Sequence, residues 1–307
     1  MPIAIGVDIG GSHISCAAVD MKTHKTLSKT YFKQEVNSKD SKENILKTWG
    51  NCINKTLASI IEETVEGISF AMPGPFKYKE GIAMFEINDK YEALYNVSVV
   101  EELPKYLSRQ DLKLRFLNDA SSFGLGSILT GGVSSDKKVI AVTLGTGFGA
   151  AFFDGMMPVL TGDRVPENGC LWDKEYKDGI SDDYFSTRWF LSKYQDKFGV
   201  KTIHGVKSII EENEDAAKEI FTEFSDNFYE YMLPYINNFT PDLLVIGGSI
   251  AKSSKLFLPR LEQLFENGES SLKIQIIDNT EVANIIGASY TLNDVFWNEI
   301  KTILPEI

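Results

Sequence analysis

Residues Val139 to Gly155 read VIAVTLGTGFGAAFFDG, and this stretch decides the fold. It predicts a buried apolar strand over 139–144, a glycine turn, and a second apolar strand over 150–153. The turn contains three alternate glycines, Gly145, Gly147 and Gly149. Glycine permits backbone angles that other residues avoid, and a row of exposed N–H groups suits a phosphate. A hairpin with glycines for turn geometry alone is the alternative, but three glycines with Thr146 exceed what a two-residue turn needs.

The same pattern occurs at the start of the chain. Ile3 to Asp20 reads IAIGVDIGGSHISCAAVD, which predicts a strand, a Gly-Gly-Ser turn and a return strand. When Gly10 is set against Gly145, the two stretches match through strand, turn and return strand. Two copies of one unit suggest a duplication that produced two like domains. We expect their two loops to face one nucleotide across a cleft.

Length and composition describe an ordinary globular protein. A chain of 307 residues is long enough for two domains, each with its own core. Its hydrophobic content of 43% and charged content of 24% are typical of such proteins. The formal net charge of -12 argues against a nucleic-acid partner, which normally needs a basic surface.

Several features predict a cytoplasmic protein with no membrane partner. No apolar run approaches the roughly 20 residues of a membrane span. The first strand begins within three residues, which leaves no room for a signal peptide. The three cysteines, Cys16, Cys52 and Cys170, show no paired spacing, and a reduced compartment is the simplest interpretation.

The remaining pattern predicts alternating strands and helices. Apolar residues at helical spacing from Ile45 to Ile61 indicate an amphipathic helix with Trp49 in the core. Further predicted strands cover 26–32, 67–71, 112–117, 243–246 and 273–277. Further predicted helices cover 99–107, 120–129, 184–198, 214–239, 282–292 and 295–304.

Polar or glycine-rich segments follow several strands, where ligands collect in open α/β sheets. The strand over 67–71 runs into Pro73-Gly74-Pro75. The strand over 112–117 delivers Asn118-Asp119 before a helix, where this pair either caps the helix or supplies a general base, and the two roles are compatible. Gly247-Gly248 either allows a ring or phosphate to approach the backbone or allows close packing of helix and strand.

The residues alone leave two roles undecided, that of the segment 80–97 and that of His13. The irregular section 80–97, which contains Asn88, is either a substrate-side loop or a solvated connection, and taken alone the second is favoured. His13 follows the first glycine loop, where it either donates to a phosphate or packs as an ordinary histidine.

Taken together and in order, these motifs resemble the ROK family of repressors and sugar kinases, which has the actin-like ATPase (ribonuclease H-like) fold. The resemblance covers nearly the whole chain. It rests on the following motifs: DIGGS at 8–12, PGP at 73–75, Asn118-Asp119, LGTGFG at 144–149, IGGSIA at 246–251 and GAS at 287–289. The resemblance implies an α/β protein of two domains, one of residues 1–117 with 290–307 and one of residues 118–289.

The resemblance also implies the roles of single residues. Asp119 would be the base that deprotonates a sugar hydroxyl, and Asn118 would hold a neighbouring hydroxyl. Asp8 would lie near Mg²⁺ through water, and Mg²⁺ bridges the phosphates of ATP in such reactions. The expected ATP and phosphate contacts are Asp8, Gly10, Gly11, Ser12, His13, Gly145, Thr146, Gly147, Gly247 and Gly248. The expected sugar contacts are Asn118, Glu167, Cys170, Asp182, Gly74 and Asn88.

The sequence departs from the family pattern at two of those positions. The sugar-contacting Glu-x-Gly-His motif matches residues 167–170 with Cys170 in place of histidine, and a later glutamate falls at Asp182. Family members that bind a structural zinc use that histidine with three cysteines, but residues 171–181 contain no cysteine. We therefore predict no zinc site.

These features predict an ATP- and Mg²⁺-dependent kinase that phosphorylates a primary hydroxyl of a hexose, with glucose and its O6 as the default. The resemblance implies a homodimer. One alternative is a sugar-responsive repressor, but the chain begins on its first strand and is acidic. The other is a non-catalytic sugar-binding regulator, marked by the changes at Cys170 and Asp182, although Asp8, Asp119 and the glycine loops are intact.

Overall fold

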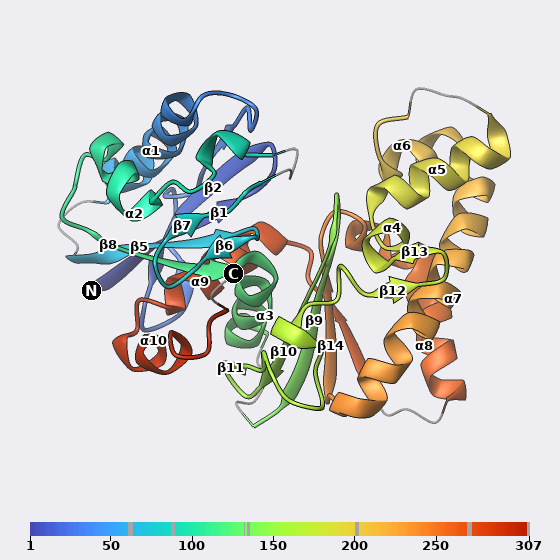
Figure 1. Cartoon of the computed structure of the whole chain (residues 1–307). Helices are drawn as coiled ribbons and strands as arrows, with labels where there is room; N and C mark the ends of the chain where they lie inside the picture. The colour runs from blue at the N-terminus through green and yellow to red at the C-terminus, as the bar shows by residue number, and fades with distance from the viewer. Residues whose placement is uncertain are drawn as a thin grey trace. The chain divides into compact units, whose positions relative to one another are not determined.

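The computed structural model describes residues 1–60, 64–86, 90–131, 133, 136–199, 203–268 and 272–305. The chain divides into two compact units (Figure 1). Unit 1 contains Met1–Val133 and Glu281–Ile307, and unit 2 contains Ser134–Thr280. These boundaries differ from the predicted ones, after residues 117 and 289. Residues 118–133 and 281–289 belong to unit 1 because the helices they form pack within that unit.

Unit 1 is built on a mixed sheet. Strands β1 (Pro2–Ile9) and β2 (His13–Asp20) form the predicted antiparallel hairpin. Strands β5 (Thr64–Met72) and β8 (Lys113–Asn118) continue the sheet in parallel with β1. With the short strands β3 (Lys25–Thr26) and β4 (Phe32–Glu35) included, the order is β3-β2-β1-β5-β8, and β4 also pairs with β2.

The single strand predicted over 26–32 is wrong. The structure has two short strands instead, β3 (Lys25–Thr26) and β4 (Phe32–Glu35). Between them Lys29 has a left-handed φ of 64°, which an extended strand does not allow. The turn lets β3 pair with one end of β2 and β4 with the other end.

Helices cover both faces of this sheet. Helix α1 (Lys42–Ala58) shares one hydrophobic cluster with Cys16 and Ala18 of β2, and Trp49 is fully buried there, as predicted. The alternate residues Ala17 and Val19 belong to a second cluster with α9 (Thr280–Tyr290). Period-two alternation along β2 therefore supplies both layers. On the α1 side, the Sγ atoms of Cys16 and Cys52 lie 3.5 Å apart as free thiols.

The backbones of two helices of unit 1 come into direct contact. In α3 (Asp119–Thr130), a Cβ added to Gly126 would lie 1.9 Å from the carbonyl oxygen of Ala283 in α9. A Cβ added to Gly287 of α9 would lie 1.8 Å from the carbonyl oxygen of Ser122 in α3. Real side chains cannot occupy such positions, so the two glycines set how closely α3 and α9 approach.

Unit 2 repeats the sheet plan of unit 1. Strands β9 (Lys138–Leu144) and β10 (Phe148–Asp154) form the predicted antiparallel hairpin. Strands β14 (Leu243–Gly247) and β15 (Lys273–Ile276) continue it in parallel with β9, and β11 (Met157–Pro158) extends its other edge. The order β11-β10-β9-β14-β15 matches a hairpin followed by two parallel strands, as in unit 1.

Helices α7 (Glu214–Phe239) and α8 (Ser254–Asn267) pack against the sheet of unit 2 (Figure 1). Helix α7 has the bounds predicted from its apolar stripe, and Phe224, Phe228 and Tyr231 are buried in the core. The shorter helices α4 (Ser181–Tyr184), α5 (Thr187–Phe198) and α6 (Val206–Glu212) complete this layer.

The connections contain several short elements. The helix predicted over 99–107 is divided near Pro104 into α2 (Val99–Glu102) and the 3₁₀ turn η2 (Leu103–Tyr106). The other short elements are β6 (Phe76–Lys77), β7 (Ile82–Ala83), η1 (Glu92–Leu94), η3 (Glu167–Gly169), β12 (Glu175–Tyr176), β13 (Gly179–Ile180), η4 (Ala251–Ser253) and α10 (Asp294–Ile300). Among the residues that the structure describes, none of the helices has the length and apolar character of a membrane span.

The contact between α3 and α9 gives a test of the fold. Gly126→Ala should lower the free energy of unfolding by about 3 kcal/mol, because the new methyl group forces two backbones apart. Urea denaturation followed by circular dichroism measures this change. Gly205→Ala is the control, since a Cβ there meets nothing within 4 Å and its φ of 166° is ordinary extended backbone. Equal stability of the two variants would contradict the tight contact.

Candidate functional site

The parallel strands of unit 1 bring three predicted motifs to one edge of the sheet. In the strand register, Asp8 of β1 pairs with Ala71 of β5, and Ala71 pairs with Leu117 of β8. All three strands run in the same direction, so their carboxyl ends lie together. The Gly10 loop, the Pro73-Gly74-Pro75 turn and Asn118-Asp119 follow those ends directly.

Asp8 is a buried carboxylic acid, only 5% exposed. Asn284 Nδ2 of α9 donates a 2.8 Å hydrogen bond to Asp8 Oδ1. Burial raises the pKa of Asp8 to about 7, and the nearby charges of Asp119 and Glu281 act in the same direction, while the bond from Asn284 opposes them. Asp8 thus titrates near neutral pH in the folded chain.

The oxygen atoms around Asp8 suit a hard cation. Asn284 Oδ1 is buried and has no hydrogen-bond partner among the residues the structure describes. Carboxylate and amide oxygens are ligands that Mg²⁺ prefers, and they can also accept hydrogen bonds from its bound water. Within the described part of the chain, no group of three or more His, Cys, Asp or Glu side chains could hold a metal ion by itself. The oxygen atoms of Asp8 and Asn284 therefore fit a magnesium ion whose other coordination positions are filled by water and phosphate oxygens.

Asp119 is the first residue of α3, and Asn118 is its N-cap. Asn118 Oδ1 accepts from the backbone N–H groups of Ala120 and Ser121 at 3.0 and 3.2 Å. Its Nδ2 donates to the Tyr78 hydroxyl at 3.1 Å. The predicted capping role of Asn118 is therefore present, and Tyr78 is a neighbour that sequence reasoning missed.

The environment of Asp119 favours the protonated carboxyl group more than water does. Burial raises the pKa of Asp119, while hydrogen bonds from the backbone, including Ala120 N–H at 2.8 Å, and the charge of Lys90 lower it. The net shift is upward. A carboxylate whose pKa is moved toward neutrality is suited to accept a proton.

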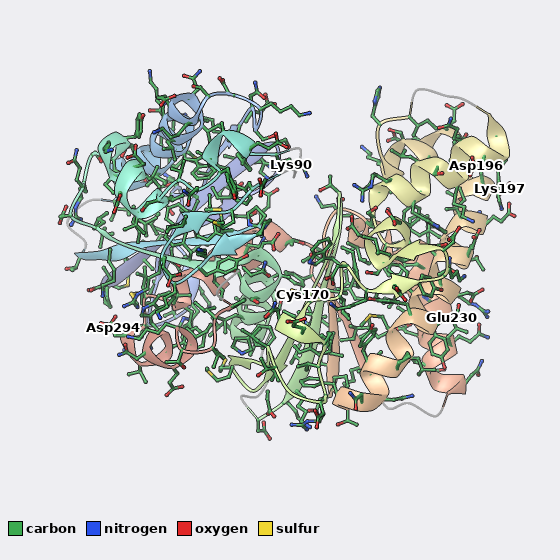
Figure 2. The ribbon with its side chains drawn as sticks, in the orientation of Figure 1. Lys90, Cys170, Asp196, Lys197, Glu230 and Asp294 are labelled. Carbon is green, nitrogen blue, oxygen red and sulfur yellow. The ribbon has the colours of Figure 1, made fainter. Side chains whose placement is uncertain are left out.

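The first glycine loop is covered by two basic side chains. The His13 ring lies over Gly10, where an added Cβ would be 3.0 Å from His13 Cε1. The Lys90 side chain lies over Gly11, where an added Cβ would be 2.9 Å from Lys90 Nζ (Figure 2). Lys90 was not predicted, because its segment is irregular and 79 positions separate it from Gly11. Ser12 is exposed on the same loop.

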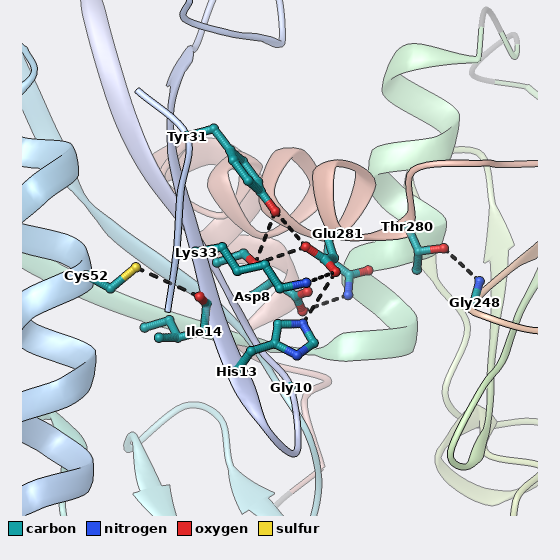
Figure 3. Close-up of polar contacts among 12 residues, drawn as sticks. Asp8, Gly10, His13, Ile14, Tyr31, Lys33, Cys52, Gly248, Thr280 and Glu281 are labelled. Atoms are coloured by element: carbon teal, nitrogen blue, oxygen red, sulfur yellow. Dashed lines mark hydrogen bonds and ion pairs between the residues drawn. The ribbon is translucent and has the colours of Figure 1, made fainter. Parts of the chain in front are cut away.

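Glu281 forms polar contacts with residues of β2 and β4 and with Tyr31, which directly precedes β4. Its carboxylate accepts from the Tyr31 hydroxyl at 2.6 Å, from Ser15 Oγ at 3.0 Å and from Lys33 Nζ at 2.6 Å. His13 Nε2 lies 3.4 Å away (Figure 3). The interaction with His13, followed by those with Lys33 and Tyr31, lowers the pKa of Glu281 well below its ordinary value. His13 is thereby tied to a residue far away in the sequence.

In unit 2, the residue that leads into the second glycine loop, Leu144, contacts the segment 248–250. Ile250 N donates to Leu144 O at 3.0 Å, and a Cβ on Gly248 would lie 2.1 Å from that same oxygen. Gly248 has a φ of 97°, so only glycine fits there without strain. Its N–H donates to Thr280 Oγ1 at 2.7 Å. The predicted Gly247-Gly248 motif therefore packs directly against the strand that leads into Gly145.

Asp182 makes contacts that the sequence did not predict. Its Oδ1 accepts from Phe148 N at 2.6 Å, and its Oδ2 pairs with Arg188 Nη2 at 2.5 Å. The structure thus places Asp182 beside the second glycine loop, where it would meet an added Cβ of Gly147 at 3.1 Å. Its expected sugar contact stays a prediction.

Two other expected sugar contacts lie in unit 2. Glu167 is exposed at the start of η3, and Cys170 directly follows that turn, with Cys170 Sγ 3.5 Å from Asn168 O (Figure 2). The hydrogen bond and ion pair with Asp173, at 2.9 Å, are the main reasons why the pKa of Lys174 is raised, and Cys170 and Glu167 add smaller contributions.

The last two expected sugar contacts lie in the N-terminal part of the chain. Gly74 is exposed in unit 1, near the Tyr78 hydroxyl. The expected contact Asn88 lies outside the described residues.

Comparison with known proteins gives a consistent set of relatives. A model of the ROK family matches residues 4–271. The glucokinase of Thermotoga maritima is 25% identical over 85% of this chain and 87% of its own length. The N-acetyl-D-glucosamine kinase of Vibrio parahaemolyticus is 25% identical over 82% of this chain and 86% of its own length. A ROK family glucokinase from Streptomyces griseus, solved with glucose and AMPPNP, has the same fold, with a TM-score of 0.72 and 18% identity over 94% of this chain and 98% of that one.

The polar cluster around Glu281 gives a pH-dependent test. Because the folded pKa of Glu281 is lowered, its stabilising contribution is present above the ordinary value of 4.5 and is lost as the pH falls below it. Glu281→Gln should therefore lower the free energy of unfolding by about 2 kcal/mol at pH 7, and by less at pH 3. Urea denaturation at both pH values measures the two differences.

Glu211→Gln is the control for that experiment. Glu211 pairs with Lys207 at 3.4 Å, but its side chain is 63% exposed, so its loss should change stability by only a few tenths of a kcal/mol. A loss at Glu281 that is as small as this, or that does not depend on pH, would show that the cluster contributes little.

Proposed function

This chain belongs to the ROK family, and we propose that it is an ATP-dependent sugar kinase with Asp119 as its general base. Its curated relatives include a glucokinase and an N-acetyl-D-glucosamine kinase, each 25% identical to it. Both phosphorylate a sugar according to their names, which supports the reaction class. The default substrate is a glucose-like hexose, phosphorylated at O6.

The observation that carries this proposal is the pair of acidic residues at one edge of the sheet of unit 1. Asp8 lies near the carboxyl end of β1, and Asp119 directly follows β8, which is parallel to β1 and separated from it by β5. Each of the two carboxyl groups has a raised pKa caused mainly by burial. Phosphoryl transfer to an alcohol needs a group that accepts the hydroxyl proton and a cation that neutralises phosphate charge. One carboxylate is available for each task.

In this proposal Asp119 accepts the proton of the sugar hydroxyl as that oxygen forms a bond to the terminal phosphorus of ATP. The bond from that phosphorus to the bridging oxygen breaks, and ADP leaves. Its side chain is fixed by the N-terminus of α3, through the bond from Ala120 N–H. Asn118 holds the start of the same helix, and its amide is directed by Tyr78. Both residues are therefore ordered before a sugar binds, which reduces the entropy lost on binding.

Asp8 and Asn284 would hold Mg²⁺, directly or through water. The cation would neutralise charge on the phosphate oxygens, which is the main contribution that a metal makes to this chemistry. The loops at Gly10-Gly11-Ser12 and Gly145-Thr146-Gly147 would donate backbone N–H groups to phosphate oxygens. The N–H groups of Gly10 and Gly145 close the two turns by bonds to His13 O and Gly147 O, so the donors would be the two residues after each of these glycines. Gly247-Gly248 would allow the adenosine part of the nucleotide to approach the backbone.

Two further sugar contacts are proposed in unit 2. Glu167 and Cys170 follow each other closely around η3 and are the proposed sugar contacts of unit 2. Cys170 is a weaker hydrogen-bonding group than the histidine of the family motif. The family also contains regulators, so a sugar-binding protein without turnover is the competing outcome. A cytoplasmic homodimer with no zinc site remains our expectation.

The test compares wild type with Asp119→Asn. The asparagine keeps an oxygen for the Ala120 N–H bond but cannot take up the proton, so turnover should fall by about 10²- to 10⁴-fold. Sugar affinity should change by no more than about threefold, because the uncharged contacts remain. Coupled ADP release from Mg-ATP across a panel of hexoses measures turnover, and calorimetry measures sugar binding.

Asp111→Asn is the matched control, since Asp111 is an exposed carboxylate in the same unit. Its turnover should equal that of wild type. Wild-type turnover in Asp119→Asn would remove Asp119 as the base. Sugar binding by the wild type without ADP release would favour the regulator, and absence of both would overturn the kinase proposal.

A further inference from the structure

The segment 181–188 is fastened to the second glycine loop at three points, all within unit 2. Asp182 Oδ1 accepts from Phe148 N at 2.6 Å. Gly145 O accepts from both Thr187 N at 2.7 Å and Thr187 Oγ1 at 2.8 Å. The start of α5 and the glycine loop therefore form one local structure.

Arg188 is held beside this loop by Asp182. Its Nη2 donates to Asp182 Oδ2, and the other oxygen of that carboxylate is bonded to the loop backbone. A single carboxylate thus separates the guanidinium from the glycine loop. The Asp182 side chain is 18% exposed and the Arg188 side chain is 66% exposed. The cation is therefore fixed at one end and accessible to a ligand at the other.

Arg188 compensates the negative charge of Asp182 beside the glycine loop. A carboxylate beside a loop that receives phosphate would repel the phosphate. Arg188 offsets that repulsion, and its guanidinium has five N–H donors, of which the bond to Asp182 uses one. Guanidinium groups bind phosphate oxygens through strong, charge-assisted hydrogen bonds.

Two residues before Arg188 in the sequence, the N-terminus of α5 contains a buried hydroxyl without a protein partner among the described residues. Ser186 is the N-cap residue of α5, yet its Oγ makes no capping bond. That oxygen is fully buried, and it has no hydrogen-bond partner among the described residues. Buried polar atoms are normally satisfied by protein, water or ligand.

We propose that Arg188 binds a phosphate group of the nucleotide and that Asp182 is its positioning residue. This inference rests on the proposed function, since it needs a nucleotide whose phosphates reach the Gly145–Gly147 loop. It assigns Asp182 to the nucleotide rather than to the sugar. An ordinary exposed ion pair is the competing explanation, and such pairs contribute little to stability.

The experiment measures binding of adenosine, AMP, ADP and ATP to the full chain by calorimetry, so that no turnover is needed. Arg188→Ala should weaken binding of at least one phosphorylated nucleotide about tenfold, while adenosine affinity stays within about twofold. The shortest nucleotide that loses affinity identifies the phosphate that Arg188 contacts. Arg188→Lys should restore part of the loss, because it keeps the charge but not the forked geometry.

Arg260→Ala is the matched control. Arg260 is also an exposed arginine of unit 2 in an ion pair, with Asp226 at 2.9 Å, but it lies on α8. Nucleotide affinities of this variant should equal those of wild type. Unchanged nucleotide affinity in Arg188→Ala, or an equal loss for adenosine, would overturn the assignment of Arg188.

Asp182→Asn tests the positioning role. Asparagine can still accept from Phe148 N–H but no longer carries the charge that holds Arg188, so nucleotide affinity should fall by less than in Arg188→Ala. A loss of sugar affinity alone would overturn the positioning role. The kinase proposal fails separately, if nucleotides bind to wild type but no sugar is phosphorylated. A wild type that binds no nucleotide would overturn both.

Discussion

The backbone contact between α3 and α9 is the constraint on which the site of unit 1 depends. Gly126 and Gly287 let the two helices approach until each carbonyl lies where a side chain would otherwise be. Asp119 begins α3, and Asn284 lies one turn before Gly287 in α9. The same contact therefore fixes the helix that presents the proposed base and the helix that presents the amide bonded to Asp8. A wider separation would move two polar groups at once.

The two glycine loops show how one backbone plan acquires two different chemical environments. In unit 1 the loop lies beside the carboxylates of Asp8, which is buried, and Asp119, which is partly buried, and desolvation is the main cause of their raised pKa values. In unit 2 the acidic residue beside the loop is Asp182, which is paired with Arg188 and bonded to the backbone. A cation is therefore close to each loop, Lys90 in one unit and Arg188 in the other. The strand order is shared, whereas the side chains around it are not.

The sequence predicted the parts of this structure that depend on local pattern. Alternating and helical apolar spacing identified the β1–β2 and β9–β10 hairpins, α1 and α7, because burial of one face determines those elements. The order of the glycine motifs predicted the ROK family, which the family match confirms, and the likeness to solved structures confirms the fold. The prediction of a single strand over 26–32 is wrong because Lys29, in its middle, has a left-handed backbone conformation. A lysine in the sequence does not indicate such a conformation.

Long-range contacts were the other part that the sequence did not predict. Asp182 reaches Phe148 across 34 positions, Asn284 reaches Asp8 across 276, and Glu281 reaches Lys33 across 248. No local pattern marks an asparagine or a glutamate as the partner of a residue so far away. Such pairs depend on the packing of whole helices and strands, which only the folded chain reveals.

The placement of the three cysteines has a practical consequence. Cys16 and Cys52 are fully buried against each other in unit 1, whereas Cys170 of unit 2 is partly exposed. A thiol-specific reagent should therefore label one position in the folded chain and three in the unfolded chain. The two cysteines that react slowly, Cys16 and Cys52, both lie in unit 1, so their labelling rate reports how often that unit opens. No added fluorophore or mutation is needed. The chain thus carries its own chemical reporter of local unfolding.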